Sequence, residues 1–148
     1  MLCLGIESTA HTFGIGIVND KGKVLANQRS MYTTEKGGIH PIKATNHHIL
    51  LCDELIKNAL TEAKLKLSDI DLIAFAQGPG LGQTLRTGAV TARTLSKLLN
   101  IPLVGVNHCV AHIEIGKQKT KLEDPVTLYV SGANTQIIAY AGNRYRVF

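Results

Sequence analysis

Two histidines lie four residues apart in the segment NHCVAHIE, at His108 and His112. Residues four apart share one face of an α-helix, so both imidazoles can reach one metal ion if this segment is helical. Glu114 follows the pair instead of lying between the histidines, which excludes the H-E-x-x-H pattern of zinc proteases. Two histidines supply only half of a tetrahedral site, so a metal here needs further ligands. Without them, the pair is an ordinary feature of a helix surface.

A glycine-rich segment is a second candidate, for binding phosphate. GPGLGQTLR at 78–86 follows an apolar run and precedes a helical pattern, so its backbone N–H groups would lie at the positive end of a helix. It is not a P-loop, which needs Gly-Lys-Ser/Thr, nor a dinucleotide fingerprint, which needs a third glycine where Gln83 stands. A phosphate contact and a structural turn both remain open.

A short internal repeat gives a third candidate. STAHT at 8–12 and SGANT at 131–135 both read Ser-x-Ala-x-Thr, and each lies between two apolar runs. Loops of small residues present N–H groups that hold phosphate oxygens, although the same residues are common in simple turns. For the pair of loops we favour a nucleotide or phosphate cleft. Its first side would include Ser8, Thr9 and His11.

Apolar runs and helical periodicity indicate an α/β framework for these candidates. Strands are predicted at 2–7, 13–18, 24–28, 70–76 and 103–106, and helices at 41–65, about 83–99 and from about 107. Hairpin-connected strands leading into β-α-β units are typical of a mixed sheet with flanking helices, of the ribonuclease-H-like kind.

The helical spacing predicts one buried apolar stripe on each of the first two helices, and two further sets of residues are expected to be exposed. The expected stripes are Ile49, Cys52, Ile56, Ala59 or Leu60, and Ala63 on the first helix, and Leu85, Ala89, Ala92, Leu95 and Leu99 on the second. We expect His40, His47 and His48 to be solvated or to cap the first helix. We expect the lysines at 117–121 to lie in a loop.

The strand pattern restarts after Pro125, with strands predicted at 127–130, 136–140 and 145–148. We therefore expect residues 1–124 to form one complete lobe and residues 125–148 to be the opening strands of a second, incomplete lobe. Exposed edges of such strands favour pairing with a second copy of the chain, so a homodimer is one expectation.

Composition excludes several classes of protein. With 148 residues, of which 45% are hydrophobic and 18% charged, the chain is neither disordered, collagen-like nor a disulfide scaffold. No apolar run reaches the roughly 18–20 residues that cross a bilayer, so we expect no membrane association. Three widely spaced cysteines favour a reducing, cytoplasmic compartment. The net charge of +5 is compatible with nucleic-acid binding but is weak evidence for it.

Four segments in this order resemble one family: GIESTAHTFG at 5–14, GPGLGQTLRTG at 78–88, NHCVAHIEIG at 107–116 and YVSGANTQ at 129–136. They resemble the TsaD/Kae/Qri family of tRNA threonylcarbamoyl transferases, and its archaeal members in particular, the catalytic subunits of the KEOPS complex. The resemblance runs over the whole chain and implies an actin-like, two-lobed ATPase fold. It departs at Ala133, where the family usually has glycine and where a methyl group would narrow the space for a phosphate.

The resemblance also implies ligands and a reaction. It implies one divalent ion, iron or zinc, bound by His108, His112 and the phenol of Tyr129 together with an aspartate of the second lobe. It implies that a nucleotide-like substrate, threonylcarbamoyl-adenylate or ATP, contacts Tyr129, Val130, Ser131, Gly132, Ala133 and Asn134. The implied reaction moves threonylcarbamoyl to N6 of the adenosine beside the anticodon of tRNAs that read ANN codons. No catalytic side chain is assigned.

The implied partners are tRNA, a small kinase or ATPase subunit, and a small dimerising subunit that binds the helical face of the first lobe. Three functions remain open: part of a transferase that is inactive alone, a lobe that only docks partners, and another actin-like kinase or ATPase. The histidine pair argues against the last, because sugar kinases need no such metal site. We expect the chain alone to bind metal weakly and to transfer nothing.

Overall fold

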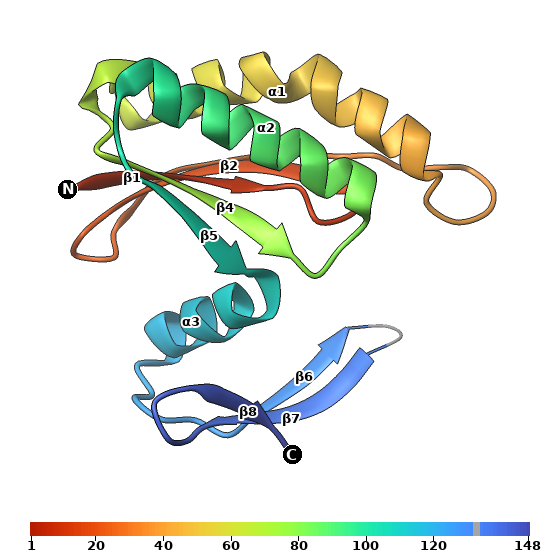
Figure 1. Cartoon of the computed structure of the whole chain (residues 1–148), viewed down its shortest axis with the longest axis vertical. Helices are drawn as coiled ribbons and strands as arrows, with labels where there is room; N and C mark the ends of the chain where they lie inside the picture. Colours follow the sequence, from red (N-terminus) through yellow and green to blue (C-terminus); the bar gives the residue numbers. More distant parts are fainter. Residues whose placement is uncertain (132–133) are drawn as a thin grey trace. The chain divides into compact units, whose positions relative to one another are not determined.

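The computed structural model describes residues 1–131 and 134–148, which form two compact units, Met1–Val106 and Asn107–Phe148 (Figure 1). The first unit contains β1 (Leu2–Glu7), β2 (Thr12–Asn19), β3 (Val24–Met31), α1 (Pro41–Ala63), a 3-10 turn (Leu67–Asp69), β4 (Leu72–Gly78), α2 (Gly82–Leu99) and β5 (Leu103–Asn107). The second contains α3 (His108–Thr120), β6 (Thr127–Ser131), β7 (Asn134–Tyr140) and β8 (Tyr145–Val147).

The first unit is built on a mixed sheet with strand order β3-β2-β1-β4-β5. β1 pairs antiparallel with β2 and parallel with β4, while β2 and β3 form an antiparallel pair. The helices α1 and α2 lie side by side against this sheet (Figure 1). The predicted mixed sheet with flanking helices is therefore confirmed.

Alternation along the two central strands creates the core. Leu4 lies opposite Ile17, and Ile6 opposite Ile15, so these four side chains share one face of the sheet, and all four are buried. Each large aliphatic side chain buried in this way contributes about 1.5–3 kcal/mol. Phe13 continues the same face on β2.

The chain stays inside the protein where β1 ends, and its carbonyl groups are paired there. The Thr9 carbonyl oxygen accepts hydrogen bonds from the Leu81 N–H at 2.7 Å and the Thr84 hydroxyl at 3.3 Å. A Cβ at Gly80 would lie 2.4 Å from that oxygen, so the approach of the two loops requires glycine. The glycine segment at 78–82 thus holds the end of β1.

Ser8 makes an equally close contact with α2. Its side chain is fully buried, and none of the described residues offers its hydroxyl a hydrogen-bond partner. A Cβ at Gly88 would lie 2.1 Å from the Ser8 oxygen. The absence of a side chain at Gly88 therefore sets how closely α2 approaches β1.

A pair of histidines on α1 holds the next residue of the same loop. His48 is fully buried, and its Nε2 lies 3.0 Å from the Ala10 carbonyl oxygen. The two Nδ1 atoms of His47 and His48 are 3.2 Å apart, and His47 Nε2 lies 3.1 Å from the Ser30 hydroxyl. Because a carbonyl only accepts, His48 donates from Nε2, His47 donates to His48, and Ser30 donates to His47, with both rings neutral.

The expectation that His47 and His48 are solvated or capping is therefore wrong. Desolvation on burial lowers the pKa of His48 and of His47. His40 does occupy the residue before α1, but its side chain makes no capping hydrogen bond.

The buried stripes of both helices also differ from the prediction. On α1 the buried residues are Ala44, His48, Leu55, Ile56 and Ala59, and on α2 they are Thr84, Gly88, Ala92 and Leu95. Ile49 is 58% exposed. The apolar pattern correctly placed Ile56, Ala59, Ala92 and Leu95 in the core. It missed the non-aliphatic positions His48, Thr84 and Gly88, which contact the loop after β1.

The second unit is a three-stranded antiparallel sheet, in the order β6-β7-β8, with α3 against it. α3 runs to Thr120, so Lys117 and Lys119 lie in its last turns and not in a loop as predicted. Cations there complement the negative end of the helix dipole. The predicted division into lobes at residues 124 and 125 stays a prediction; α3 belongs to the same compact unit as β6–β8.

Among the described helices, none combines the length and apolar character needed to span a bilayer.

We expect the stability of the first unit to fall on acidification because of His48. Burial lowers the pKa of His48 in the native state, and His47 and His11 lower it further, while the hydrogen bond to the Ala10 carbonyl and the charge of Glu7 act in the opposite direction. The unfolded chain, with a histidine pKa of about 6.5, then binds more protons than the native state as the pH falls below about 7. Stability should therefore be greatest above pH 7 and decline towards the lower native pKa. His48→Gln should flatten this profile in urea unfolding followed by circular dichroism.

The matched control is His40→Gln, at an exposed position just before α1, which should leave the profile unchanged. A His48→Gln profile as steep as that of the wild type would contradict this account of the buried ring.

We expect Gly88→Ala to destabilise the protein by about 1–3 kcal/mol, although alanine favours helices, because the added methyl group meets the Ser8 hydroxyl. Ser8→Gly should restore much of the loss in the double variant, measured by urea unfolding. Gly116→Ala, on α3 where an added Cβ meets nothing within 4 Å, serves as the control for helix propensity. Equal stability of Gly88→Ala and wild type would disprove the close approach.

Candidate functional site

The N-terminus of α3 positions the histidine pair. The Asn107 side-chain oxygen accepts hydrogen bonds from the N–H groups of Cys109 at 2.9 Å and Val110 at 3.2 Å. Asparagine is a strong N-cap residue, so it fixes where the helix begins. His108 is then the first helical residue, and His112 lies one turn further on the same face.

The two imidazoles converge on one point. His108 Nε2 and His112 Nε2 are 3.2 Å apart, and the ring planes are nearly perpendicular, at 89°. Two nitrogens bound to one tetrahedral Zn²⁺ at about 2.0–2.1 Å would be about 3.3 Å apart. The separation therefore fits two ligands of a single divalent ion, and it fits a hydrogen bond between two neutral rings equally well.

Tyr129 lies on β6 beside this pair. The Tyr129 and His112 ring centroids are 6.0 Å apart, and both residues line a pocket of about 360 Å³ whose other lining residues are His108, Ile113, Thr127, Leu128 and Val130. Within the described residues, no third His, Cys, Asp or Glu completes a metal-binding group with the histidines. Among the described residues, the groups that line this pocket and could donate to a metal are thus two imidazoles and the Tyr129 phenol. Their binding of an ion stays a prediction.

The remaining predicted ligand residues near Tyr129 are only partly described. Val130 alternates with Tyr129 along β6, so its side chain lies on the opposite face of the sheet, where it is 67% exposed. Ser131 pairs with Asn134 at the end of the hairpin. Gly132 and Ala133 lie outside the described residues, so their contact with a nucleotide stays a prediction.

The loop after β1 uses its polar groups internally. Thr9 donates to the Glu7 carboxylate from its N–H at 2.6 Å and also from its hydroxyl, while Ser8 is buried against α2. His11 is the residue of this group that is half-exposed at the loop surface. Direct contact of Ser8 or Thr9 with a ligand would require the loop to move, and the assignment of Ser8, Thr9 and His11 to ligand binding stays a prediction.

The two repeat segments both join antiparallel strands, as expected, but in different registers. Glu7 pairs with Gly14 at the end of the first hairpin. The equivalent pair in the second repeat would be Val130 with Ile137, yet Val130 pairs with Thr135. The strand register of the second repeat therefore differs by two residues from that of the first.

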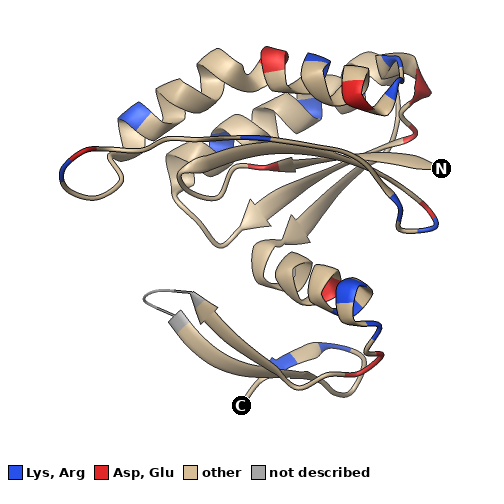
Figure 2. Ribbon diagram, turned by 180° about the vertical axis from the view of Figure 1, so that it is seen from behind, with Lys and Arg blue, Asp and Glu red and all other residues tan. Residues whose placement is uncertain are grey.

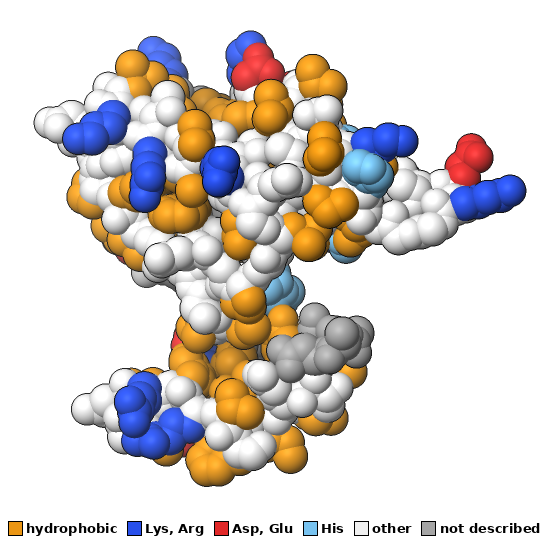
Figure 3. Space-filling model, turned by 45° about the vertical axis from the view of Figure 1, so that its right-hand side comes forward, with side chains coloured by type: hydrophobic (Ala, Val, Ile, Leu, Met, Phe, Trp, Pro, Cys, Tyr) orange, Lys and Arg blue, Asp and Glu red, His pale blue; other side chains and the backbone are white. Residues whose placement is uncertain are grey.

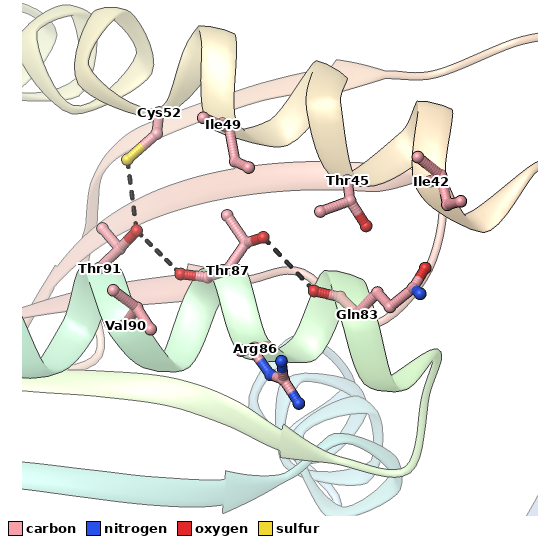
Figure 4. Close-up of a pocket in the computed structure, with 9 residues that line it drawn as sticks. All are labelled: Ile42, Thr45, Ile49, Cys52, Gln83, Arg86, Thr87, Val90 and Thr91. Atoms are coloured by element: carbon pink, nitrogen blue, oxygen red, sulfur yellow. Dashed lines mark hydrogen bonds between the residues drawn. The ribbon is translucent and has the colours of Figure 1, made fainter.

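A groove between α1 and α2 was missed by sequence reasoning (Figure 4). It measures about 520 Å³ and is lined by Ile42, Thr45, Ile49 and Cys52 of α1 and by Gln83, Arg86, Thr87, Val90 and Thr91 of α2. The Thr91 hydroxyl lies 3.4 Å from Cys52 Sγ, which links the two helices at one end. Apolar side chains reach the surface of these helices (Figure 3). Ile49 and Val90 are apolar residues that lie outside the buried stripes of their helices, and both are exposed. Exposed apolar residues at these positions are the sequence feature that marks the groove.

Basic residues do not form one dominant patch. Lysines and arginines are distributed along both units, interspersed with acidic residues (Figure 2). Charge alone therefore identifies no nucleic-acid interface.

Comparison with known proteins finds close relatives in sequence. The chain is 59% identical, over all 148 residues, to the tRNA N6-adenosine threonylcarbamoyltransferase of Thermococcus sibiricus and covers 45% of that protein. It therefore spans somewhat less than half the length of this relative.

Two solved structures share the fold at low sequence identity. YeaZ from Pseudomonas aeruginosa matches 99% of this chain and 63% of its own, with a TM-score of 0.68 at 16% identity. A putative N-acetylmannosamine kinase, Lmo2764 from Listeria monocytogenes, matches 99% of this chain and 49% of its own, with a TM-score of 0.59 at 15% identity. The actin-like ATPase and kinase fold class is thereby confirmed.

A family model described as "TsaD: tRNA N6-adenosine threonylcarbamoyltransferase" matches residues 22–148. This match covers most of the chain, including α3 and the hairpin that carries Tyr129. The chain belongs to the TsaD family of tRNA N6-adenosine threonylcarbamoyltransferases.

Proposed function

We propose that this chain supplies part of the active site of a transferase that moves threonylcarbamoyl from threonylcarbamoyl-adenylate to N6 of the adenosine beside the anticodon. The observation that carries the proposal is the convergence of two histidine nitrogens, 3.2 Å apart, next to Tyr129 in a chain of this family. A role as another actin-like kinase is disfavoured by the same observation and by the family match.

The reaction is an acyl transfer. The N6 amine attacks the carbamoyl carbon, the new carbon–nitrogen bond forms, and the bond from that carbon to the phosphate oxygen breaks. AMP leaves with the electron pair of the broken bond, and the amine loses one proton to the medium. A divalent ion bound by this chain would act as a Lewis acid that polarises the carbonyl oxygen and orients the adenylate.

The residues of this chain would hold the ion and fix the orientation of its ligands. His108 and His112 would bind the ion through their Nε2 atoms, which must be unprotonated, and the Tyr129 phenol lies on the same side of the pocket. Asn107 fixes the start of α3 and thereby the direction of both rings. The implied aspartate and the rest of the nucleotide pocket would come from a second lobe.

The groove between α1 and α2 is the surface we assign to a partner subunit. Its lining is mostly apolar and includes Ile42, Ile49 and Val90, each more than half exposed. Exposed apolar patches of this kind mark interaction sites, and the resemblance names a small dimerising subunit that binds the helical face of the lobe. We infer the same partner here, and with tRNA as substrate we place the protein in the cytoplasm. A kinase or ATPase subunit and a homodimer through β6–β8 stay predictions.

A chimera tests the proposed reaction. This chain would replace the matching 45% of the Thermococcus sibiricus protein, and transfer from threonylcarbamoyl-adenylate to tRNA would be measured with bound metal. We expect the chimera to transfer. His108→Ala and His112→Ala should each lose the metal and reduce transfer about a hundredfold or more, since even outer-shell changes typically cost ten- to a hundredfold.

His40→Ala, at an exposed position, is the control and should retain both metal and activity. Normal transfer without the histidines would disprove the metal centre. A chimera that keeps its metal but transfers nothing, beside an active relative, would disprove the assigned reaction.

The partner surface has its own test. We expect Ile49→Glu to weaken binding of the dimerising subunit at least tenfold in titration calorimetry, because a carboxylate in an apolar groove loses its hydration. Thermal stability should not change, since Ile49 is exposed. Leu98→Glu, on α2 at an exposed position outside the groove, is the matched control and should bind normally. Equal loss of binding in both variants would contradict the groove as the docking surface.

A further inference from the structure

Apolar packing alone does little to fix α3 on its sheet. All of α3 is described, and Ile113 is its one buried residue. Burying a single isoleucine contributes about 1.5–3 kcal/mol, and the hydrophobic effect has no direction. A helix held in this way can roll about the buried side chain. The direction of His108 and His112 must therefore be fixed by other contacts.

The face of the sheet that α3 contacts is defined by the strand register. Tyr129 on β6 pairs with Gln136 on β7, and Tyr140 on β7 pairs with Tyr145 on β8. Paired residues share a face, and so do residues two apart on one strand. Tyr129, Tyr145 and the buried Ile138, which lies between Gln136 and Tyr140, therefore all point to the same side.

Two residues of α3, on either side of Ile113 in the sequence, contact the two outer strands of the sheet. The His112 ring lies against Tyr129 of β6, and the Glu114 carboxylate accepts a hydrogen bond from the hydroxyl of Tyr145 on β8. Ile113, which lies between these two residues in the sequence, is buried. With 3.6 residues per turn, His112 lies about 100° to one side of Ile113 and Glu114 about 100° to the other. A roll about Ile113 that moves His112 away from Tyr129 must therefore also displace Glu114 from Tyr145.

Lys117 reinforces the contact with β8. Its ammonium group lies 3.4 Å from the Tyr145 hydroxyl, 3.6 Å from the Glu114 carboxylate and 5.9 Å from the centre of the Tyr145 ring. The exposed pair of Glu114 and Lys117 would contribute little by itself, because both residues belong to the same helix. Tyr145 gives the pair a structural role, because it contacts both charged groups from β8 and lies 31 residues from Glu114 in the sequence.

The Tyr145 phenol acts as a donor and not as a proton-transfer group. Its hydrogen bond to Glu114 raises the pKa of Tyr145 above the ordinary value for tyrosine. The phenol is thus protonated at neutral pH, as a donor to a carboxylate must be. The cluster of Glu114, Lys117 and Tyr145 is therefore suited to holding α3 in place.

We propose that Tyr145 is a positioning residue for the metal centre: by holding Glu114 and Lys117 it prevents α3 from rolling and keeps His108 and His112 directed towards Tyr129. This inference rests on the proposed function, in which the two histidines bind the ion. It assigns to the β7–β8 hairpin a role that neither the repeat nor the histidine spacing indicates.

The test measures Co²⁺ binding by the full chain, through competition with a chromophoric chelator and through the ligand-field absorption of the bound ion. Amide hydrogen exchange of α3 is measured in the metal-free protein. We expect Tyr145→Phe and Glu114→Ala to bind Co²⁺ about tenfold more weakly, the loss typical of outer-shell changes, with an altered spectrum and faster exchange in α3.

Two variants serve as controls. Tyr140→Phe removes a hydroxyl from the neighbouring ring, 5.2 Å from Tyr145, to which the described residues give no hydrogen bond, and it should behave as the wild type. Glu114→Gln keeps an oxygen that can accept the Tyr145 hydrogen bond, and it should largely restore affinity, spectrum and exchange.

The outcomes separate the two levels of the proposal. Wild-type affinity, spectrum and exchange in Tyr145→Phe overturn the positioning role, and so does an equal loss in Tyr140→Phe. A wild-type chain that binds no Co²⁺ overturns the proposed metal centre instead. In that case the exchange of α3 alone decides whether Tyr145 fixes the helix.

Discussion

The carbonyl groups at the end of β1 impose the main constraint on the first unit. Ser8 and Thr9 remain buried after the strand ends, Ala10 is half-buried, and carbonyl oxygens shielded from water must be paired. Thr84 and the Leu81 N–H pair with Thr9, and the His48 ring pairs with Ala10. These partners bring α2 and α1 close to the loop, which in turn requires glycine at positions 80 and 88. The polar residues buried in the core and the two close glycine contacts thus have one cause.

This constraint explains where the sequence could predict the fold and where it could not. Among the described residues, local periodicity located the eight strands and the three α-helices, although α3 runs further than the short helix that we expected. The buried helix faces were predicted only in part, because apolar patterns treat His48 and Thr84 as surface residues, whereas both are buried and pair with carbonyl groups. Their partners lie 38 and 75 residues away, so no local pattern contains the information. Ile49 was assigned to the core by the same reasoning and instead lines the groove between the helices.

In the candidate site, too, features set by local sequence were predictable and features set by long-range contacts were not. Asn107 as an N-cap and the spacing of His108 and His112 are local signals, and they correctly placed both imidazoles on one helix face. The role of Tyr129 comes from the resemblance and stays a prediction; the structure shows that its ring centroid lies 6.0 Å from that of His112. Tyr145 was treated only as part of a strand, because its contact with Glu114 depends on the pairing of β7 with β8 and on α3 lying against that face. The matching five-residue motifs, in contrast, predicted two similar loops, and the strand registers differ by two residues.

The arrangement in the second unit bears on how the metal centre would be used. His108, His112 and Tyr129 all belong to one compact unit and line one pocket. If two imidazoles and a phenol hold an ion as we propose, that ion would keep open positions, which is the condition for binding a substrate oxygen. A ligand from a second lobe would then strengthen binding and join that lobe to this unit at the same time. An ion of this kind would couple the closing of the cleft to the binding of substrate, because both events fill positions on the same ion.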